Sequence, residues 1–138
     1  MDQRLSFVTL AVRDLDATRR FYVDGLGWEP ALDVPGEVIM IQAGPQLVLS
    51  LWDADEFEQE VGPITRGSGV SPITLSHNVA TKAEVDAALT TARAAGADPV
   101  SEPFERDWGG YSGYFADPDG FRWEVAYNPG EIGQVVLP

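Results

Sequence analysis

A chain of 138 residues is long enough for one compact domain and too short for two large ones. It has no cysteine, which excludes disulfides and thiolate chemistry, and its formal net charge of −13 argues against binding to nucleic-acid phosphates or anionic membranes. No apolar run reaches the length of a membrane span, and the N-terminus lacks the charged-then-apolar pattern of a signal peptide. We therefore expect a cytoplasmic globular protein with a single core.

The first part of the sequence, at about residues 5–52, predicts a β-α-β-β-β module. Residues 6–13 alternate strictly between two faces, which is typical of a strand. Asp14 can cap the helix that follows, and Gly27 ends the run of apolar residues at helical spacing. Three further strands are expected over residues 28–34, 38–43 and 46–52, separated by turns that contain Pro and Gly.

Residues 53–71 change in character, from a densely acidic run to a stretch rich in Gly and Pro. This composition predicts a linker between two modules, with room for a short helical turn. The order of elements then restarts in a second module at about residues 72–129, followed by an apolar tail at 130–138.

The second module begins with an expected strand over residues 72–79. Thr81-Lys82-Ala83-Glu84 is a capping box that starts a helix, and Gly96 ends it. Residues 98–106 predict a strand near a sheet edge, because Pro99 and Pro103 interrupt it.

An aromatic hairpin completes this module, with strands expected over residues 110–116 and 121–127. The tetrapeptide Asp117-Pro118-Asp119-Gly120 has the chemistry of a tight turn between them. Glu124 is the one acid on the second strand, and alternation places Arg122 and Ala126 on its face while Trp123 and Val125 face the other way. Arg122 is the candidate partner of the Glu124 carboxylate, but we expect desolvation of the carboxylate to outweigh this pairing.

Two segments carry a resemblance to a known family: VTLAVRDLDATRRFYVDGLGW near the N-terminus and GYFADPDGFRWEVAYNP at the last hairpin. In these segments the chain resembles the vicinal oxygen chelate superfamily, which includes glyoxalase I, extradiol dioxygenases and bleomycin-resistance proteins. The resemblance implies an α+β fold in which two tandem βαβββ modules form a curled mixed-sheet cup. It also implies a homodimer.

The metal-dependent members of that superfamily have four ligand positions, on the first and last strands of each module. Transferred to this sequence, these positions fall on Phe7, Ser50, Pro72 and Glu124. Phe and Pro cannot coordinate a metal and a serine hydroxyl is a poor ligand, whereas even a catalytic zinc site needs about three protein ligands. We therefore expect neither a metal nor another cofactor. The only histidine, His77, faces away from the cup unless a bulge reverses it.

The resemblance and the strand alternation together define a candidate ligand site lined by aromatic and polar side chains. The cup is expected to be lined by Phe7, Thr9, Val48, Ser50, Trp52, Thr74, Ser76, Arg122 and Glu124, with Trp108, Tyr111 and Tyr114 near its rim.

Three functions remain open from the sequence. The first is a metal-free binding protein of the bleomycin-resistance type, which holds a flat, partly aromatic small molecule in a dimeric cup. The second is a lyase, isomerase or dioxygenase that uses a relocated metal, or Glu124 as a base with Arg122 or Tyr114 stabilising charge. The third is a protein whose cup is filled by its own side chains and which acts through its surface.

Overall fold

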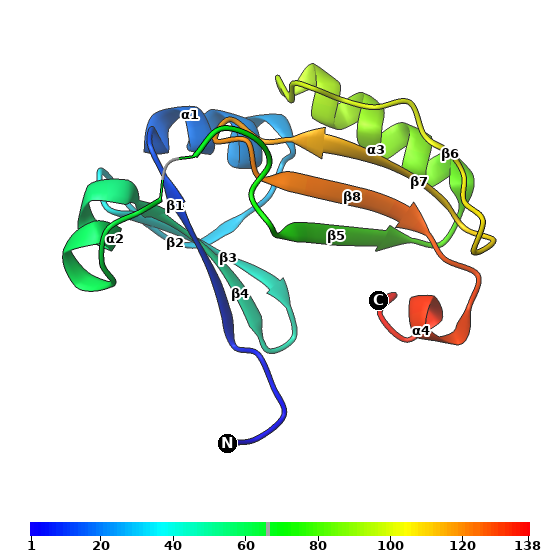
Figure 1. Cartoon of the computed structure of the whole chain (residues 1–138), viewed down its shortest axis with the longest axis horizontal. Helices are drawn as coiled ribbons and strands as arrows, with labels where there is room; N and C mark the ends of the chain where they lie inside the picture. The colour runs from blue at the N-terminus through cyan, green and yellow to red at the C-terminus, as the bar shows by residue number, and fades with distance from the viewer. Residues whose placement is uncertain (66) are drawn as a thin grey trace. The chain divides into compact units, whose positions relative to one another are not determined.

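The computed structural model of the chain describes residues 1–65 and 67–138. The chain divides into two compact units, Met1–Ser68 and Gly69–Pro138, and each unit contains one four-stranded mixed sheet with accompanying helices (Figure 1). The predicted α+β fold with two tandem βαβββ modules is confirmed. Arg66, which belongs to the expected linker, lies outside the described residues.

The sheet of the first unit has the strand order β1-β4-β3-β2, in which β1 runs parallel to β4 and the other neighbours are antiparallel. Its elements are β1 (Phe7–Val12), α1 (Leu15–Arg19), the π-helix η1 (Arg20–Gly25), β2 (Pro30–Val34), β3 (Val38–Gly44), β4 (Leu47–Asp53) and α2 (Ala54–Glu60).

The sheet of the second unit repeats this arrangement with the order β5-β8-β7-β6, and β5 runs parallel to β8. Its elements are β5 (Thr74–Val79), α3 (Lys82–Ala94), β6 (Phe104–Glu105), β7 (Tyr111–Ala116), β8 (Arg122–Tyr127) and α4 (Glu131–Gln134). No helix in the described ranges is both long and apolar enough to cross a membrane.

The predicted caps and the predicted turn are all present. Asp14 Oδ1 accepts a hydrogen bond from the Ala17 amide at 2.9 Å, and Thr81 Oγ1 accepts one from the Glu84 amide at 3.2 Å. In the last hairpin the buried Asp117 carboxylate accepts from the Asp119 and Phe121 amides, at 3.0 Å and 2.9 Å. These side chains satisfy backbone donors that would otherwise lack partners where each element begins.

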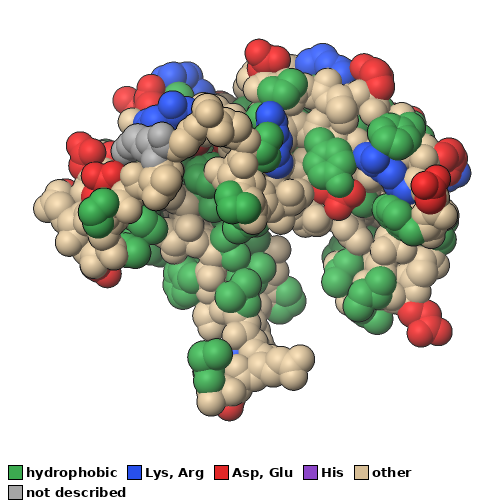
Figure 2. All heavy atoms as spheres, in the orientation of Figure 1, with side chains coloured by type: hydrophobic (Ala, Val, Ile, Leu, Met, Phe, Trp, Pro, Cys, Tyr) green, Lys and Arg blue, Asp and Glu red, His purple; other side chains and the backbone are tan. Residues whose placement is uncertain are grey.

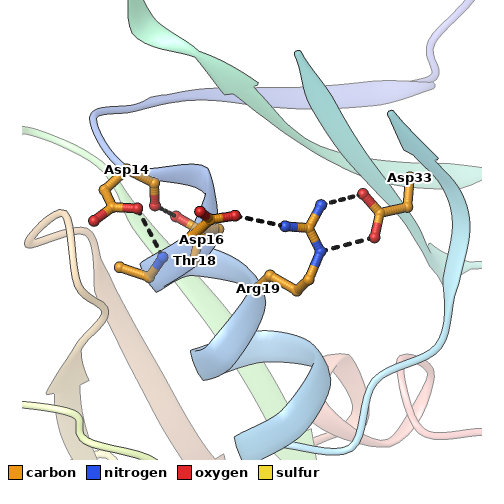
Figure 3. Close-up of polar contacts among 6 residues, drawn as sticks. Asp14, Asp16, Thr18, Arg19 and Asp33 are labelled. Carbon is orange, nitrogen blue, oxygen red and sulfur yellow. Dashed lines mark hydrogen bonds and ion pairs between the residues drawn. The ribbon is translucent and has the colours of Figure 1, made fainter. Parts of the chain in front are cut away.

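One salt bridge in the first unit joins the α1 helix to the edge strand β2. Figure 3 shows the Arg19 guanidinium between Asp16 and Asp33. Arg19 Nε donates to Asp33 Oδ2 at 2.9 Å, Nη2 donates to Asp33 Oδ1, and Nη1 donates to Asp16 Oδ1 at 3.0 Å. This bidentate geometry fixes the orientation of the helix against the strand.

Each sheet has one apolar face that packs against a helix. In the second unit Val125 is buried on this face, and Gly113 lies opposite it in register. A Cβ built on Gly113 would lie 2.6 Å from Leu89 Cδ1 of α3, so glycine allows the helix to approach the sheet closely. In the first unit the corresponding buried residues on β1, β3 and β4 are Leu10, Val12, Ile39, Ile41, Leu49 and Leu51.

The structure corrects two details of the sequence interpretation. The segment expected as a strand over residues 98–106 forms only the two-residue β6 and an isolated bridge from Val100 to Phe115, because its prolines cannot donate ladder hydrogen bonds. The first strand of the second module begins at Thr74, not at Pro72. The short helical turn allowed for in the acidic part of the linker is the helix α2, whose first amides are capped by Asp53.

Candidate functional site

The Glu124 carboxylate on β8 lies at the centre of a cluster of hydroxyl groups in the second unit. Tyr114 Oη donates a hydrogen bond to Glu124 Oε1 at 2.8 Å, and Ser112 Oγ donates to the same oxygen at 3.0 Å. Ser76 Oγ lies 3.4 Å from Glu124 Oε2, which is a long contact for a hydroxyl donor. Hydrogen bonds to a charged acceptor are roughly twice as strong as neutral ones, so this network fixes the position of the carboxylate.

The register of the sheet explains why these side chains meet. Ser76 on β5 and Tyr114 on β7 are both paired with Glu124, and Ser112 is paired with Ala126, two residues further along β8. Residues directly opposite one another on neighbouring strands share a face of the sheet. The Glu124 face is therefore the one opposite to the face that contacts α3.

Arg106 extends this cluster from the loop between β6 and β7. Its Nε donates to Ser112 Oγ at 2.8 Å and its Nη2 donates to the Ser112 carbonyl oxygen at 3.2 Å. The guanidinium carbon lies 3.8 Å from the centre of the Phe104 ring and 5.4 Å from that of the Tyr114 ring. The fully buried Ser112 thus connects a guanidinium, stacked on an aromatic ring, to the Glu124 carboxylate.

Phe104, Arg106 and Ser112 are site residues that the sequence did not predict. Ser112 could have been found, because it lies two residues before Tyr114 on a strand and therefore shares its face. Arg106 follows the irregular segment around β6, where alternation does not predict the direction of a side chain.

The phenol of Tyr114 has a raised pKa. Burial is the largest cause, followed by the hydrogen bond to Glu124 and the negative charge of that carboxylate, while the positive charge of Arg106 acts in the opposite direction. The phenol therefore remains protonated at neutral pH and acts as a hydrogen-bond donor to the carboxylate.

The candidate pairing of Arg122 with Glu124 is not formed. Arg122 lies on the same face, opposite Thr74 and Ala116, but within the described part of the chain no ion pair joins it to Glu124. Residues two apart on one strand are separated by about 6.6 Å, whereas a directly opposite residue on a neighbouring strand is about 5 Å away. Cross-strand hydroxyls therefore reach the carboxylate first.

The two remaining aromatic candidates of this unit occupy different places. Trp108 is 53% exposed, and its indole covers Gly110 so closely that a Cβ there would lie 1.7 Å from Trp108 Cζ3. Tyr111 lies on the opposite face from Glu124, where its hydroxyl donates to Asp86 of α3 at 2.9 Å. Tyr111 is therefore not part of the Glu124 cluster, and its expected place beside Tyr114 is corrected.

The candidates of the first unit also share one face of their sheet. Thr9 is paired with Ser50, Phe7 with Val48, and Ala11 with Trp52. Ser50 is buried and has Met40 on its other side, while Trp52 packs edge-on against Phe57 of α2 with ring centres 5.8 Å apart. Among residues 1–65, the register places neither a carboxylate nor a guanidinium opposite Ser50 on this face.

The residues at the four expected ligand positions do not suit a metal ion. Ser50 and Glu124 occupy equivalent positions, because Ser50 is paired with Thr9 of β1 and Glu124 with Ser76 of β5. Phe7 is then equivalent to Thr74, since each lies two residues before that paired residue, at the start of its strand. The transferred position at Pro72 is therefore corrected to Thr74, whose hydroxyl is a poor ligand. His77 is paired with Val125 on the helix-side face, and within residues 1–65 and 67–138 no group of three or more His, Cys, Asp and Glu side chains could hold a metal ion.

Comparisons with known proteins give one consistent assignment. A family model described as the Glyoxalase/Bleomycin resistance protein/Dioxygenase superfamily matches residues 4–125. A glyoxalase-related enzyme from Fulvimarina pelagi is 36% identical with a TM-score of 0.82, over 92% of this chain and 89% of that chain. A lactoylglutathione lyase from Agrobacterium tumefaciens is 31% identical with a TM-score of 0.71, over 93% of this chain and 96% of that chain. No curated protein matches the chain.

Proposed function

We propose a function from the premise that this chain belongs to the Glyoxalase/Bleomycin resistance protein/Dioxygenase superfamily. The proposed function is that of a metal-free binding protein of the bleomycin-resistance type, whose ligand is a flat, partly aromatic small molecule. The observation that carries this proposal is the environment of Glu124. Three hydroxyl groups contact the carboxylate, and among the residues that the structure describes it belongs to no group of His, Cys, Asp and Glu side chains that could hold a metal ion. These neighbours favour hydrogen bonding to an organic ligand.

Exposed aromatic side chains of the same unit support an aromatic ligand. Phe104 is 55% exposed, and together with Trp108 it flanks the loop that carries Arg106. Exposed large aromatic groups close to convergent polar groups are typical of ligand sites, because a planar ligand removes the apolar surface from water by stacking.

A fluorescence titration tests the proposal. We expect members of a panel of flat aromatic compounds to quench the emission of Trp108, and Trp108→Ala to weaken their binding. Trp28, which packs against Tyr22 in the first unit at a ring-centre distance of 5.6 Å, provides the control. Trp28→Phe retains the quenching, whereas Trp108→Phe loses it. Equal affinity of the parent and Trp108→Ala for every ligand, or one tightly held divalent metal per chain by elemental analysis, contradicts the proposal.

A second candidate function is a lyase or isomerase that uses Glu124 as a base. Two observations favour it: the 31% identity to a structure described as a lactoylglutathione lyase, and the protonated Tyr114 phenol hydrogen-bonded to Glu124 at 2.8 Å, which could return a proton. The hemithioacetal that glutathione forms with methylglyoxal is the isomer of S-lactoylglutathione, so incubation with these two compounds separates the two candidates. Appearance of the thioester absorbance in the parent protein, and its absence in Glu124→Gln, favours the enzyme over the binding protein.

The proposal includes a homodimer, for which the C-terminal segment offers an apolar surface. Ile132, Val135 and Val136 are exposed, and hydrophobic side chains gather at this end of the chain in Figure 2. The segment is held in place through Asn128: the Gln134 side chain donates to the Asn128 carbonyl oxygen at 2.8 Å, and a Cβ on Gly133 would lie 2.3 Å from Asn128 Cβ. An anchored segment with outward apolar side chains suits a contact with a second copy.

We expect sedimentation velocity at micromolar concentration to give the mass of a dimer. The double variant Ile132→Gln/Val135→Gln is expected to shift the population to monomer, because it removes apolar area from the contact. Val61→Gln/Val70→Gln is the matched control, since these two valines are also exposed but lie outside this segment. A parent protein that sediments as a monomer contradicts the prediction.

A further inference from the structure

The two oxygens of the Glu124 carboxylate differ in their hydrogen bonding. Oε1 accepts from both Ser112 and Tyr114, at 3.0 Å and 2.8 Å, whereas Oε2 has only the 3.4 Å contact with Ser76 among the described residues. An ionised carboxylate can accept about four hydrogen bonds. Oε2 therefore retains the capacity for a strong donor, and the Glu124 side chain is only partly buried, so that such a donor can come from outside the protein.

The Arg106 guanidinium is also only partly used. Its Nε and Nη2 atoms, which form one edge of the planar group, bind the hydroxyl and the carbonyl oxygen of Ser112. One face of the group is covered by Phe104 at 3.8 Å. The other edge, formed by Nη1 and the second N–H of Nη2, has no partner within residues 1–65 and 67–138. This edge is the fork that binds a carboxylate through two parallel hydrogen bonds.

These two opposite charges are held near each other without neutralising each other. Ser112 Oγ accepts a hydrogen bond from Arg106 at 2.8 Å and donates one to Glu124 at 3.0 Å. The buried hydroxyl of Ser112 therefore bridges the two charged groups, which do not contact each other directly. Each charge therefore keeps one unsatisfied side. A ligand that carries only one charge would satisfy one of them and leave the other without a partner.

The geometry points to an aromatic zwitterion as the ligand class: a planar ring whose ammonium group donates to Glu124 Oε2 and whose carboxylate binds the free edge of Arg106. This inference rests on the proposed function, because it assumes that the Glu124 face binds a flat small molecule. The net charge of −13 does not exclude an anionic group here, since the Debye length at physiological ionic strength is about 8 Å and the adjacent guanidinium dominates at contact distance.

Isothermal titration calorimetry with defined probes tests the inference. The zwitterions are phenylalanine, 3-(aminomethyl)benzoate and 4-(aminomethyl)benzoate, which differ in the spacing of the two charges, and the singly charged controls are benzoate and benzylamine. We expect at least one zwitterion to bind about tenfold or more tightly than both controls, since one charge-assisted hydrogen bond contributes on the order of a tenfold change in affinity.

Variants assign the two ends of the ligand. Arg106→Gln is expected to reduce the affinity for the zwitterion to that for benzylamine, and Glu124→Gln to reduce it to that for benzoate. Arg106→Lys keeps the charge without the fork and gives an intermediate affinity, which keeps the test valid if Arg106→Gln disturbs Ser112. Arg93→Gln is the matched control and leaves binding unchanged. Arg93 lies on α3, and its Nη2 atom pairs with Oε1 of Glu102 at 3.1 Å, where both side chains are exposed.

Each other outcome overturns the inference. Equal binding of benzylamine and the zwitterions, or unchanged zwitterion binding in both Arg106 variants, shows that the guanidinium does not contact the ligand. If none of the five charged probes binds while uncharged flat compounds quench Trp108, this inference fails and the proposed function stands. If neither charged nor uncharged aromatic compounds bind, both are wrong.

Discussion

Replacing Leu89 by alanine is expected to lower the free energy of unfolding by about 2–5 kcal/mol, because a buried leucine side chain is lost and the cavity cannot be filled. Leu89 is 2% exposed on α3, and its Cδ1 atom occupies the space where a side chain of Gly113 would begin. The glycine cannot fill the vacated volume. The loss is therefore expected in the upper part of the range, as measured by urea denaturation.

Leu32→Ala provides the matched control for this substitution. Leu32 lies on the edge strand β2 and is 46% exposed, so its truncation is expected to change the free energy of unfolding by no more than about 1 kcal/mol. A similar loss in both variants would show that helix α3 is not packed against the Gly113 face as the structure describes.

Arg19→Ala is expected to lower the free energy of unfolding by about 0.5–1.5 kcal/mol at pH 7, because it removes a bidentate but partly exposed pair and leaves Asp16 and Asp33 close together without a cation. Arg93→Ala is the control. Arg93 and Glu102 form a single-contact pair of exposed side chains, so its loss is expected to cost about 0–0.5 kcal/mol.

The effect of Arg19→Ala depends on pH with a definite sign. The hydrogen bond from Arg19 is the largest cause that lowers the pKa of the Asp33 carboxyl below its ordinary value. A lowered folded-state pKa stabilises the protein fully above the unfolded-state value of about 4, and this stabilisation disappears as the pH falls through the lowered pKa. The difference between wild type and Arg19→Ala is therefore expected to shrink in denaturation curves below about pH 4. A difference that stays constant from pH 7 to pH 2 contradicts this assignment.

The features that the sequence predicted correctly depend on neighbours along the chain. The caps at Asp14 and Thr81 and the turn at residues 117–120 each involve side chains that bond to amides two to four residues away. Strand alternation likewise places Glu124 on the face opposite to Val125 without any knowledge of the rest of the fold.

The features that the sequence did not predict depend on contacts between strands and from irregular loops. Arg122 was expected beside Glu124 because it lies on the same strand and face, but the carboxylate is bound by residues from β5 and β7, whose register only the structure provides. Arg106 reaches the site from a loop next to a two-residue strand, for which no periodic pattern exists. Of the groups that contact the Glu124 carboxylate, the sequence thus predicted Ser76 and Tyr114, whereas Ser112 and the Arg106 behind it are seen only in the structure.

The correspondence between Ser50 and Glu124 has a consequence for protein engineering. Both residues occupy the same place in their sheets, but three hydroxyl groups contact Glu124, whereas the cross-strand neighbours of Ser50 are Thr9 and Met40. A carboxylate introduced by Ser50→Glu would be desolvated at a position that is now buried, with a single hydroxyl within reach. The two units therefore share their strand order and register, but the side chains at equivalent positions differ in their chemistry. Reproducing the Glu124 cluster in the first unit would require introducing the whole set of donors, whereas introducing the acid alone would only destabilise the sheet.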